Sequence, residues 1–325
     1  MGNRFVRNHP HKAQRLKGSG LDLSVVIVNW NTRDLLLKCL ASLYETIHNI
    51  CFEVWLVDNA STDGSVAAAQ EQFPKVQVIQ NSRNLGFAAA NNRALKQIQG
   101  RYALLLNTDA VLSEGAVQEL FNFMENNSEA AAVCGQLLNL DGSKQNSIAN
   151  FPSLASLLTN ETLLRIIFPN TYPSKLRQYE APIEIESCIG ACMMVRKTAM
   201  DSVGLLDERF FFFFEETDWA YRMRRAGWKI FFVPSARIFH VQGQSVGREA
   251  RGRLLFYRSR YLYLRKWFPK SYPLMVAAVI VRLLLNTLLT GIAVLFTACC
   301  NSKLRHRLTV YLKICMWHLR GCPEA

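Results

Sequence analysis

The stretch LSVVIVNW, residues 23–30, is the first of four short apolar runs that alternate with helical patterns. An apolar run of this length between polar residues is typical of a strand buried on both faces of a sheet. The next residues, 33–45, repeat apolar side chains at helical spacing, with five of them on one side: Leu35, Leu36, Cys39, Leu40 and Leu43. This part of the chain therefore predicts a buried strand followed by a helix that packs on it.

The same alternation continues to residue 110. Three further strand patterns are FEVWLVDN (52–59), VQVIQN (76–81) and YALLLNTDA (102–110). Between them lie two helical patterns, one that ends near residue 72 and one over 86–98. Four strand–helix units in about 90 residues predict an α/β fold, with a mostly parallel, Rossmann-like sheet and helices on both faces.

The net charge of +13 is unevenly distributed over the 325 residues. Residues 1–20 contain five Lys or Arg and no acidic residue, and residues 251–325 contain thirteen against a single glutamate. The stretch between them is mildly acidic. The basic character therefore belongs to the two ends, and nucleic acid is not expected as a partner.

The nine cysteines indicate reduced thiols. Their number is odd, no CxxC pair occurs, and most lie in apolar runs such as CIGACMMV (188–195). This favours a cytosolic compartment and argues against a disulfide framework or a zinc cage. No apolar signal-peptide segment precedes Leu21, so residues 1–20 are expected to be a disordered basic arm.

Polar side chains follow all four predicted strands at the point where each strand ends. In sheets of this kind, ligands bind beyond the carboxyl ends of the strands. A single Asn or Asp there could simply cap a helix or make a turn. Four strand ends that all finish in Asn or Asp predict a ligand site, with these members: Asn29, Asn31, Asp58, Asn59, Asn81, Asn84, Asn107 and Asp109.

Five motifs together resemble the family-2 glycosyltransferases, most closely the bacterial rhamnosyltransferase-type branch. They are SVVIVNWN (24–31), VDNASTDGS (57–65), NLGFAAANN (84–92), LLLNTDA (104–110) and FFFFEETDWAYRMRRAGWK (211–229), which FH (239–240) follows. The resemblance covers residues 21–268. It implies a GT-A fold, a dTDP- or UDP-sugar donor, a divalent cation (Mg²⁺ or Mn²⁺) and inversion at the anomeric carbon.

The resemblance implies a metal site at Asp109 and His240. Departure of a nucleotide diphosphate builds up negative charge, which a hard cation on oxygen ligands stabilises. The family usually has Asp-x-Asp, whereas this chain has NTD (107–109), so Asn107 would contact the ribose or a water molecule on the metal. A lone His after an apolar strand is more often structural, and the motif match favours ligation for His240.

The same resemblance assigns the donor side. Asp58 would accept from the N3–H of the base, and Arg83 and Asn84 would lie near the ribose and diphosphate. Asn29 and Asn31 belong to the same strand-end group. For Arg83, a solvated loop charge is the alternative.

Inverting transfer needs a base that takes the proton of the acceptor hydroxyl. The family motif places this carboxylate at Glu216, where an Asp is more usual. Residues 210–214 are predicted to form an aromatic strand beneath the acceptor side. Its Phe side chains would limit water around Glu216 and raise the pKa of the carboxyl group.

Residues 215–226 predict a helix with acids in its first turn and Gly227 as its stop. Asp218 and Arg222 have the spacing of an ion pair. Glu215 is a further acceptor-side candidate. Trp219 is also an acceptor-side candidate that could stack on a sugar, although its apolar ring favours core packing. The strand predicted over 186–197 would bring Gly190 close to the sugar.

Residues 273–300 are long and apolar enough to cross a bilayer, but Arg282, Asn286 and Thr290 form a polar stripe on them. A single span would export five cations of the segment after residue 302, against the positive-inside tendency. A hairpin or in-plane helix, with 303–319 as a second amphipathic helix on anionic lipid, fits better. A single span and a soluble cap or dimer interface are the alternatives.

The sequence thus predicts three parts: a basic arm (1–20), a catalytic domain (21–268) and membrane-associated helices (269–325). The predicted function is transfer of a sugar, plausibly rhamnose, to a lipid-linked glycan acceptor at the cytoplasmic face of the inner or plasma membrane. A homo-oligomer is possible. A nucleotidyltransferase would need a glycine-rich loop after the first strand, which is missing. A catalytically silent nucleotide-sugar-binding or scaffold protein is the other alternative.

Overall fold

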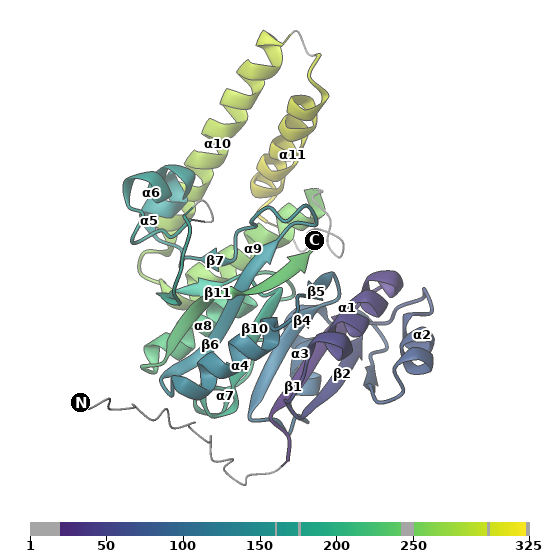
Figure 1. Cartoon of the computed structure of the whole chain (residues 1–325). Helices are drawn as coiled ribbons and strands as arrows, with labels where there is room; N and C mark the ends of the chain where they lie inside the picture. Colours follow the sequence, from purple (N-terminus) through teal and green to yellow (C-terminus); the bar gives the residue numbers. More distant parts are fainter. Residues whose placement is uncertain (1–19, 160, 175–176, 242–249, 298–299, 323–325) are drawn as a thin grey trace, which may run out of the picture.

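A nine-stranded mixed sheet forms the centre of the molecule (Figure 1). The computed structural model describes residues 20–159, 161–174, 177–241, 250–297 and 300–322, so the predicted basic arm lies outside the described residues apart from Gly20. The strands follow the order β3, β2, β1, β4, β10, β6, β11, β5, and β8 also pairs with β11. Their bounds are β1 (Leu23–Asn29), β2 (Phe52–Asp58), β3 (Gln77–Gln80), β4 (Tyr102–Asn107), β5 (Ala110–Leu112), β6 (Ala130–Leu138), β8 (Ile183–Ile185), β10 (Cys192–Arg196) and β11 (Lys229–His240). A separate pair consists of β7 (Ile148–Ala149) and β9 (Ser187–Cys188).

The first four large strands are parallel, as the sequence predicts. β1 lies between β2 and β4, and β3 pairs with β2, all in parallel register. β10 then runs antiparallel to both β4 and β6. β11 is parallel to β6 and antiparallel to β5, so β5 and β11 meet with His240 opposite Ala110. The carboxyl ends of β1, β2 and β4 therefore share one edge.

Helices cover both faces of the sheet. Their bounds are α1 (Arg33–Thr46), α2 (Ser65–Gln72), α3 (Gly86–Leu95), α4 (Ala116–Asn126), α5 (Leu154–Leu158), α6 (Glu161–Ile167), α7 (Lys197–Val203), α8 (Glu215–Arg225), α9 (Ala250–Trp267), α10 (Tyr272–Phe296) and α11 (Ser302–Leu319). Alternate residues of β1 point to opposite faces, where α1 and α4 pack on one apolar cluster and α3, α7 and α8 on the other. The predicted α/β class is confirmed.

Residues 210–214 do not form the predicted strand. They make a bent loop in which Phe213 and Phe214 both have φ of 70°. A left-handed backbone costs each non-glycine residue about 1–2 kcal/mol. Burial of Phe210 and Phe214 in a third apolar cluster offsets this cost, because the loop delivers both rings to the core.

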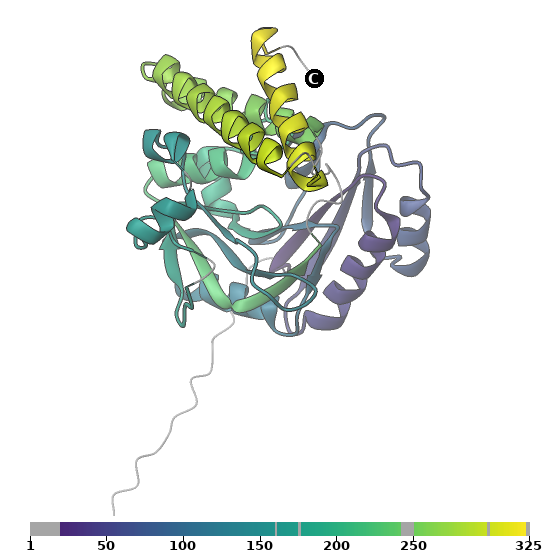
Figure 2. The same cartoon turned by 90° about the horizontal axis from the view of Figure 1, so that it is seen from above.

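The third cluster connects the loop to the C-terminal helices. It includes Leu157 of α5, Tyr263 of α9, Met275 of α10 and Trp317 of α11. α10 and α11 extend away from the sheet, with α5 and α6 beside the first half of α10 (Figures 1 and 2). The helices predicted over 273–300 and 303–319 are therefore present, and α10 is long and apolar enough to cross a membrane.

Candidate active site

A pocket of about 450 Å³ lies at the shared carboxyl edge of β1, β2 and β4. Asn59, Asn84 and Asn107 line it from the ends or following loops of three different strands. The remaining lining is largely aromatic or aliphatic and includes one cation: Val28, Trp30, Gly86, Phe87, Thr108, Phe211, Phe212, Arg251 and Leu255. A planar ring with a polar, negatively charged extension suits such a mixture of rings, amides and a guanidinium.

Asn29 and Asp58 hold the edge of the pocket together. Asn29 Nδ2 donates to Asp58 Oδ1 at 2.9 Å, and Asn29 Oδ1 accepts from Thr32 at 2.8 Å. Asp58 Oδ2 accepts from the backbone N–H of Ser61 at 2.9 Å. Both side chains are buried. The strand-end group is thus a hydrogen-bonded frame, in which Asp58 Oδ1 serves Asn29 of β1 and Oδ2 serves the loop after β2.

Asn31 and Arg83 are more open. Asn31 has φ of 52° and is exposed, and its Oδ1 accepts from the backbone N–H of Thr62 at 2.8 Å. Arg83 is exposed in the loop before α3 and is not among the described residues that line the pocket. Asn84, beside it, lines the pocket and caps the turn into Gly86 at 2.9 Å.

Asp109 and His240 meet, although 131 positions separate them in the sequence. Asp109 Oδ1 lies 3.3 Å from His240 Nε2, and both side chains are buried. Pairing of β5 with β11 brings them together, because Val241 N–H also donates to the Asp109 carbonyl at 2.9 Å. Asp109 directly follows Asn107 and Thr108, which line the pocket.

Gln145 orients the imidazole. His240 Nδ1 pairs with Gln145 Oε1 at 2.9 Å, and Gln145 Nε2 donates to the His240 carbonyl at 2.6 Å. A partner on Nδ1 leaves Nε2 facing the carboxylate, which is the usual arrangement around a metal-binding His. Within the described parts of the chain, no third His, Cys, Asp or Glu completes a cluster around them. Mg²⁺ commonly takes only one or two protein ligands and fills the rest of its shell with phosphate oxygens and water, so the pair fits such an ion.

Glu215 and Glu216 begin α8 directly after the Phe loop. Burial raises the pKa of Glu216 to about 7, and burial followed by the charge of Glu216 raises the pKa of Glu215. Although part of Glu216 is accessible, its Oε2 and that of Glu215 are buried without a hydrogen-bond partner among the described residues. Two adjacent carboxyls with free buried oxygens are costly for the fold and typical of a functional site.

Gly190 lies beside Glu216. A Cβ atom added to Gly190 would lie 3.6 Å from Glu216 Cγ. Gly190 is in the short link between β9 and β10, so the predicted strand over 186–197 is interrupted there. The absence of a side chain keeps the space beside the carboxylate open.

The Phe loop lies beside the 450 Å³ pocket as well as on the core, a position that the sequence did not predict. Phe211 and Phe212 line the pocket. Phe87 N–H donates to the Phe211 carbonyl at 2.8 Å, and the rings of Phe87 and Phe212 meet edge to face. Gly86 permits this contact: its φ is 81°, and a Cβ there would clash with the Phe211 carbonyl and ring.

The prediction of Trp219 as a sugar platform is wrong. Trp219 is fully buried among core residues, and its Nε1 donates to the Gly204 carbonyl at 2.8 Å. The alternative reading of Trp219 as a core residue holds.

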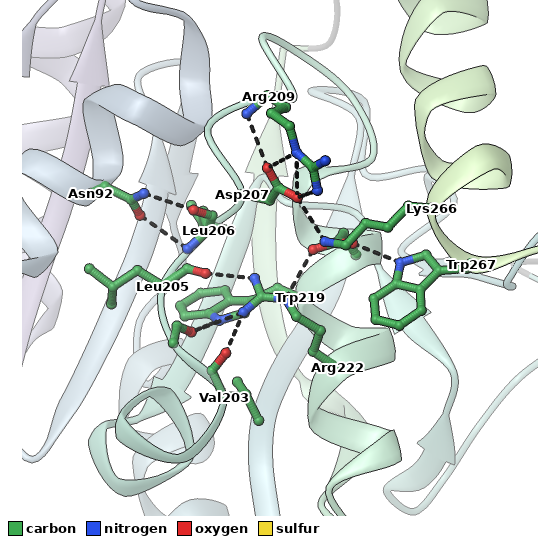
Figure 3. A network of polar contacts seen from close by, with 12 residues as sticks. Asn92, Val203, Leu205, Leu206, Asp207, Arg209, Trp219, Arg222, Lys266 and Trp267 are labelled. Atoms are coloured by element: carbon green, nitrogen blue, oxygen red, sulfur yellow. Dashed lines mark hydrogen bonds and ion pairs between the residues drawn. The ribbon is translucent and has the colours of Figure 1, made fainter. Parts of the chain in front are cut away.

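The predicted Asp218–Arg222 pair is present at 3.0 Å and belongs to a larger network (Figure 3). Asp218 also contacts Lys266 Nζ at 2.6 Å and Trp267 Nε1 at 2.8 Å, both from α9. Arg222 donates to the carbonyls of Val203 and Leu205. The contacts of Asp218 with α9 could not be predicted from local spacing, because about 48 residues separate the partners in the sequence.

Arg251 is a charged residue of the pocket that the sequence did not predict. It lies in the first turn of α9 and is the only Lys or Arg among the described residues that line the pocket. In the sequence it merges with the basic C-terminal region. Only the packing of α9 beside the Phe loop, where Ser259 donates to the Phe212 carbonyl at 2.8 Å, places it at the pocket.

Comparison with known proteins agrees with this geometry. Residues 24–204, more than half of the chain, match the family model described as glycosyl transferase family 2. The chain belongs to this family. This family-2 glycosyltransferase is 30% identical over 259 residues to the N-acetylglucosaminyl-diphospho-decaprenol L-rhamnosyltransferase of Mycobacterium tuberculosis, covering 74% of this chain and 83% of that protein. It is 24% identical to the low-salt glycan biosynthesis hexosyltransferase Agl10 of Haloferax volcanii, over 77% of this chain and 78% of the relative.

Solved structures share the fold of this family-2 glycosyltransferase. GalNAc-T7, crystallised with UDP, GalNAc and Mn²⁺, superposes with a TM-score of 0.56 at 17% identity, over 76% of this chain and 50% of that one. The mannosyltransferase PcManGT of Pyrobaculum calidifontis, in complex with GDP-Man and Mn²⁺, gives 0.53 at 15% identity, over 89% and 84%. The predicted GT-A fold is thus confirmed.

Proposed function

We propose that this enzyme transfers rhamnose from dTDP-rhamnose, with inversion, to a lipid-linked glycan acceptor at the cytoplasmic face of the membrane. Residues 21–268 would form the catalytic domain and residues 269–325 the membrane attachment. The rhamnosyltransferase of Mycobacterium tuberculosis supports this choice of donor and acceptor. Its name includes both L-rhamnose transfer and an N-acetylglucosaminyl-diphospho-decaprenol acceptor.

The observation that carries the proposal is the Asp109–His240 pair beside the amide-lined pocket. Asp109 and His240 would hold a divalent cation, and a bound cation would offset the charge of the departing diphosphate. The relative structures that contain Mn²⁺ beside UDP or GDP-Man support this assignment. Gln145 keeps the imidazole in place whether or not the ion is bound, because it holds the ring and the backbone of His240 at once.

The donor would lie in the 450 Å³ pocket. Trp30, Phe211 and Phe212 supply rings against which a pyrimidine can stack, and Asn84 and Asn107 supply amides for the ribose and diphosphate. Asp58 would accept from N3–H of the base, with Asn29 fixing its orientation. Arg251 would add a guanidinium at the diphosphate.

Glu216 would act as the base. A carboxyl group with a pKa of about 7 is partly deprotonated at neutral pH and strong enough to take a hydroxyl proton as the bond forms. Part of Glu216 is accessible, and Gly190 leaves room for the acceptor beside it. Burial and, after it, the charge of Glu216 raise the pKa of Glu215, which favours the protonated form of the carboxyl beside the base.

Transfer from radiolabelled donor to a polyprenyl diphosphate-linked N-acetylglucosamine acceptor tests this function. We expect product from dTDP-rhamnose in the presence of Mg²⁺ or Mn²⁺, and none from UDP-glucose. In thermal-shift measurements, dTDP with metal should raise the melting temperature more than UDP with metal. A shift with UDP alone would redirect the donor assignment, and equal shifts with and without metal would contradict the Asp109–His240 site.

The alternative of a catalytically silent binding protein is tested by Glu216→Gln. This variant should keep the thermal shift with dTDP and lose transfer. Unaltered transfer by Glu216→Gln would remove Glu216 as the base.

A further inference from the structure

Helix α6 exposes an apolar surface that no donor or acceptor site accounts for. Leu163, Ile166 and Ile167 of α6 are 49%, 71% and 54% exposed, and Phe168, directly after it, is 54% exposed, whereas Leu164 is 5% exposed. We call these four exposed residues the α6 patch. Isolated exposed apolar residues are normal on a protein surface, but four large ones within six positions mark an interaction site.

The α6 patch is continuous with the apolar outer face of α10. Helix α5, which precedes α6, packs on α10: Arg282 Nη1 donates to the Ser156 carbonyl at 2.8 Å, and Leu157 is buried with Met275. Both views show α5 and α6 beside α10 (Figures 1 and 2). Directly beyond the Arg282 contact, the same side of α10 exposes Leu285 and Leu289.

The outer face of α10 has no polar member. Its exposed large residues are Leu274, Val281, Leu284, Leu285, Leu288, Leu289, Ile292, Leu295 and Phe296. The polar stripe borders this face: Arg282 contacts α5, Asn286 is half-buried and Thr290 is buried. A helix with one wholly apolar outer face and a packed polar stripe is suited to lie against a bilayer.

Charge selects the occupant of this surface. Residues 251–322 contain thirteen Lys or Arg and no Asp or Glu. A second copy of the chain would bring thirteen further Lys or Arg residues in the same C-terminal segment, which opposes association. An anionic bilayer is attracted by the cations and accepts the apolar side chains between its headgroups.

We propose that the α6 patch is a second membrane contact, inserted into the surface of an anionic bilayer beside the outer face of α10. The inference deepens the proposed function by naming where the catalytic domain itself touches the lipid. The attachment then has two elements, one from the C-terminal helices and one from the catalytic domain.

This contact lies on the acceptor side of the enzyme. The chain that leads into α5 begins at Phe151, whose N–H donates to Glu186 at 2.7 Å and whose ring meets Tyr221 of α8 at 5.0 Å. Tyr221 is five residues after Glu216 on the same helix. Insertion of α6 therefore holds the helix that carries the base close to the lipid in which a polyprenyl acceptor resides.

The test is flotation of the full chain with vesicles. The variant I166S/I167S/F168S is compared with the conservative variant I166V/I167V/F168L, on vesicles of phosphatidylcholine with phosphatidylglycerol and of phosphatidylcholine alone. We expect the serine variant to bind anionic vesicles at least about tenfold less than the parent, because it lacks three apolar side chains that would insert into the bilayer. The conservative variant should bind as the parent does, and both should keep the parent's melting temperature because the altered side chains are already exposed.

Flotation of the serine variant equal to that of the parent would overturn the proposal. Equal binding of the parent to neutral and anionic vesicles would overturn the role of charge. A change from dimer to monomer in light scattering, with vesicle binding unaltered, would assign the patch to a second copy instead. Flotation needs neither donor nor acceptor. If vesicle binding depends on the α6 patch but the enzyme transfers no sugar, the proposed function is refuted and the membrane contact is not.

Discussion

Lys266 Nζ lies 2.6 Å from Asp218 Oδ1, and this contact joins α8, the helix that carries Glu216, to α9, the helix that leads into α10. The Asp218 side chain is fully buried, and Arg222 and Trp267 satisfy its remaining acceptor capacity. Lys266 also reaches Asp207 at 2.7 Å. One buried carboxylate therefore fixes α8 against α9. It thereby also fixes the position of the proposed base relative to α10 and α11.

Removal of this carboxylate should be strongly destabilising. Asp218→Ala leaves Lys266 and Arg222 without their buried partner, and the free energy of unfolding should fall by about 3–5 kcal/mol. Urea denaturation followed by fluorescence measures the loss.

Asp201→Ala is the matched control. Asp201 also pairs with a cation four residues away on a helix, Lys197 at 3.4 Å, but both side chains are exposed. Its loss should cost at most about 1 kcal/mol. Similar costs for the two alanine variants would contradict the proposed role of burial.

Gly86 should tolerate no side chain. Gly86→Ala places a Cβ against the Phe211 carbonyl in a left-handed backbone, so we expect a loss of about 3 kcal/mol or more together with weaker binding of dTDP. Gly64→Ala has nearly the same φ, 77° against 81°, and open space around the new Cβ. It should cost only the backbone strain, about 1–2 kcal/mol, and leave dTDP affinity unaltered. Calorimetric titration with dTDP measures the affinity of both variants. Equal affinities would contradict the proposed contribution of Gly86 to the pocket.

Glu216 should make both stability and activity depend on pH. Its pKa of about 7 exceeds the ordinary value of 4.5, so between these limits the folded chain retains a proton that the unfolded chain has lost. The contribution of Glu216 to stability is therefore greatest below pH 4.5 and falls as the pH rises toward 7. Transfer should rise over the same range with a midpoint near 7, because the base acts as the carboxylate.

Glu216→Gln should remove this pH dependence and lower kcat by about 10²–10⁴-fold. Glu71→Gln, at an exposed position of α2, should change neither quantity. A stability profile of Glu216→Gln that still falls between pH 4.5 and 7 would assign the titration to another group.

Gln145 should tune metal affinity without touching the ion. Gln145→Leu removes the partner of His240 Nδ1, and the affinity for Mn²⁺ in the presence of dTDP should fall about 10–100-fold. His240→Ala should reduce it further. Electron paramagnetic resonance of free Mn²⁺ measures the binding. His48→Ala is the control, because that His is exposed in the loop after α1, where it pairs with Glu114. Full Mn²⁺ affinity in His240→Ala would exclude the site.

The alternation of apolar runs and helical patterns over 23–110 predicted the parallel half of the sheet, because strand and helix periodicities are local properties of the chain. The helix over 215–226 and the pair of Asp218 with Arg222 followed from the same local spacing. The strand predicted over 210–214 was wrong. Five aromatic residues favour a strand locally, but the contacts of Phe210 and Phe214 with distant helices select a loop with two left-handed residues.

The sequence by itself determined the fold class, the family resemblance and the strand ends at which Asn and Asp gather, since each depends on residues close together in the chain. Only the tertiary structure decided which of these residues meet. It brought His240 to Asp109, Gly190 to Glu216, Arg251 to the pocket and Lys266 to Asp218, and it withdrew Trp219 into the core. These contacts depend on how strands and helices pack across large sequence separations, and no local pattern of side chains encodes that packing.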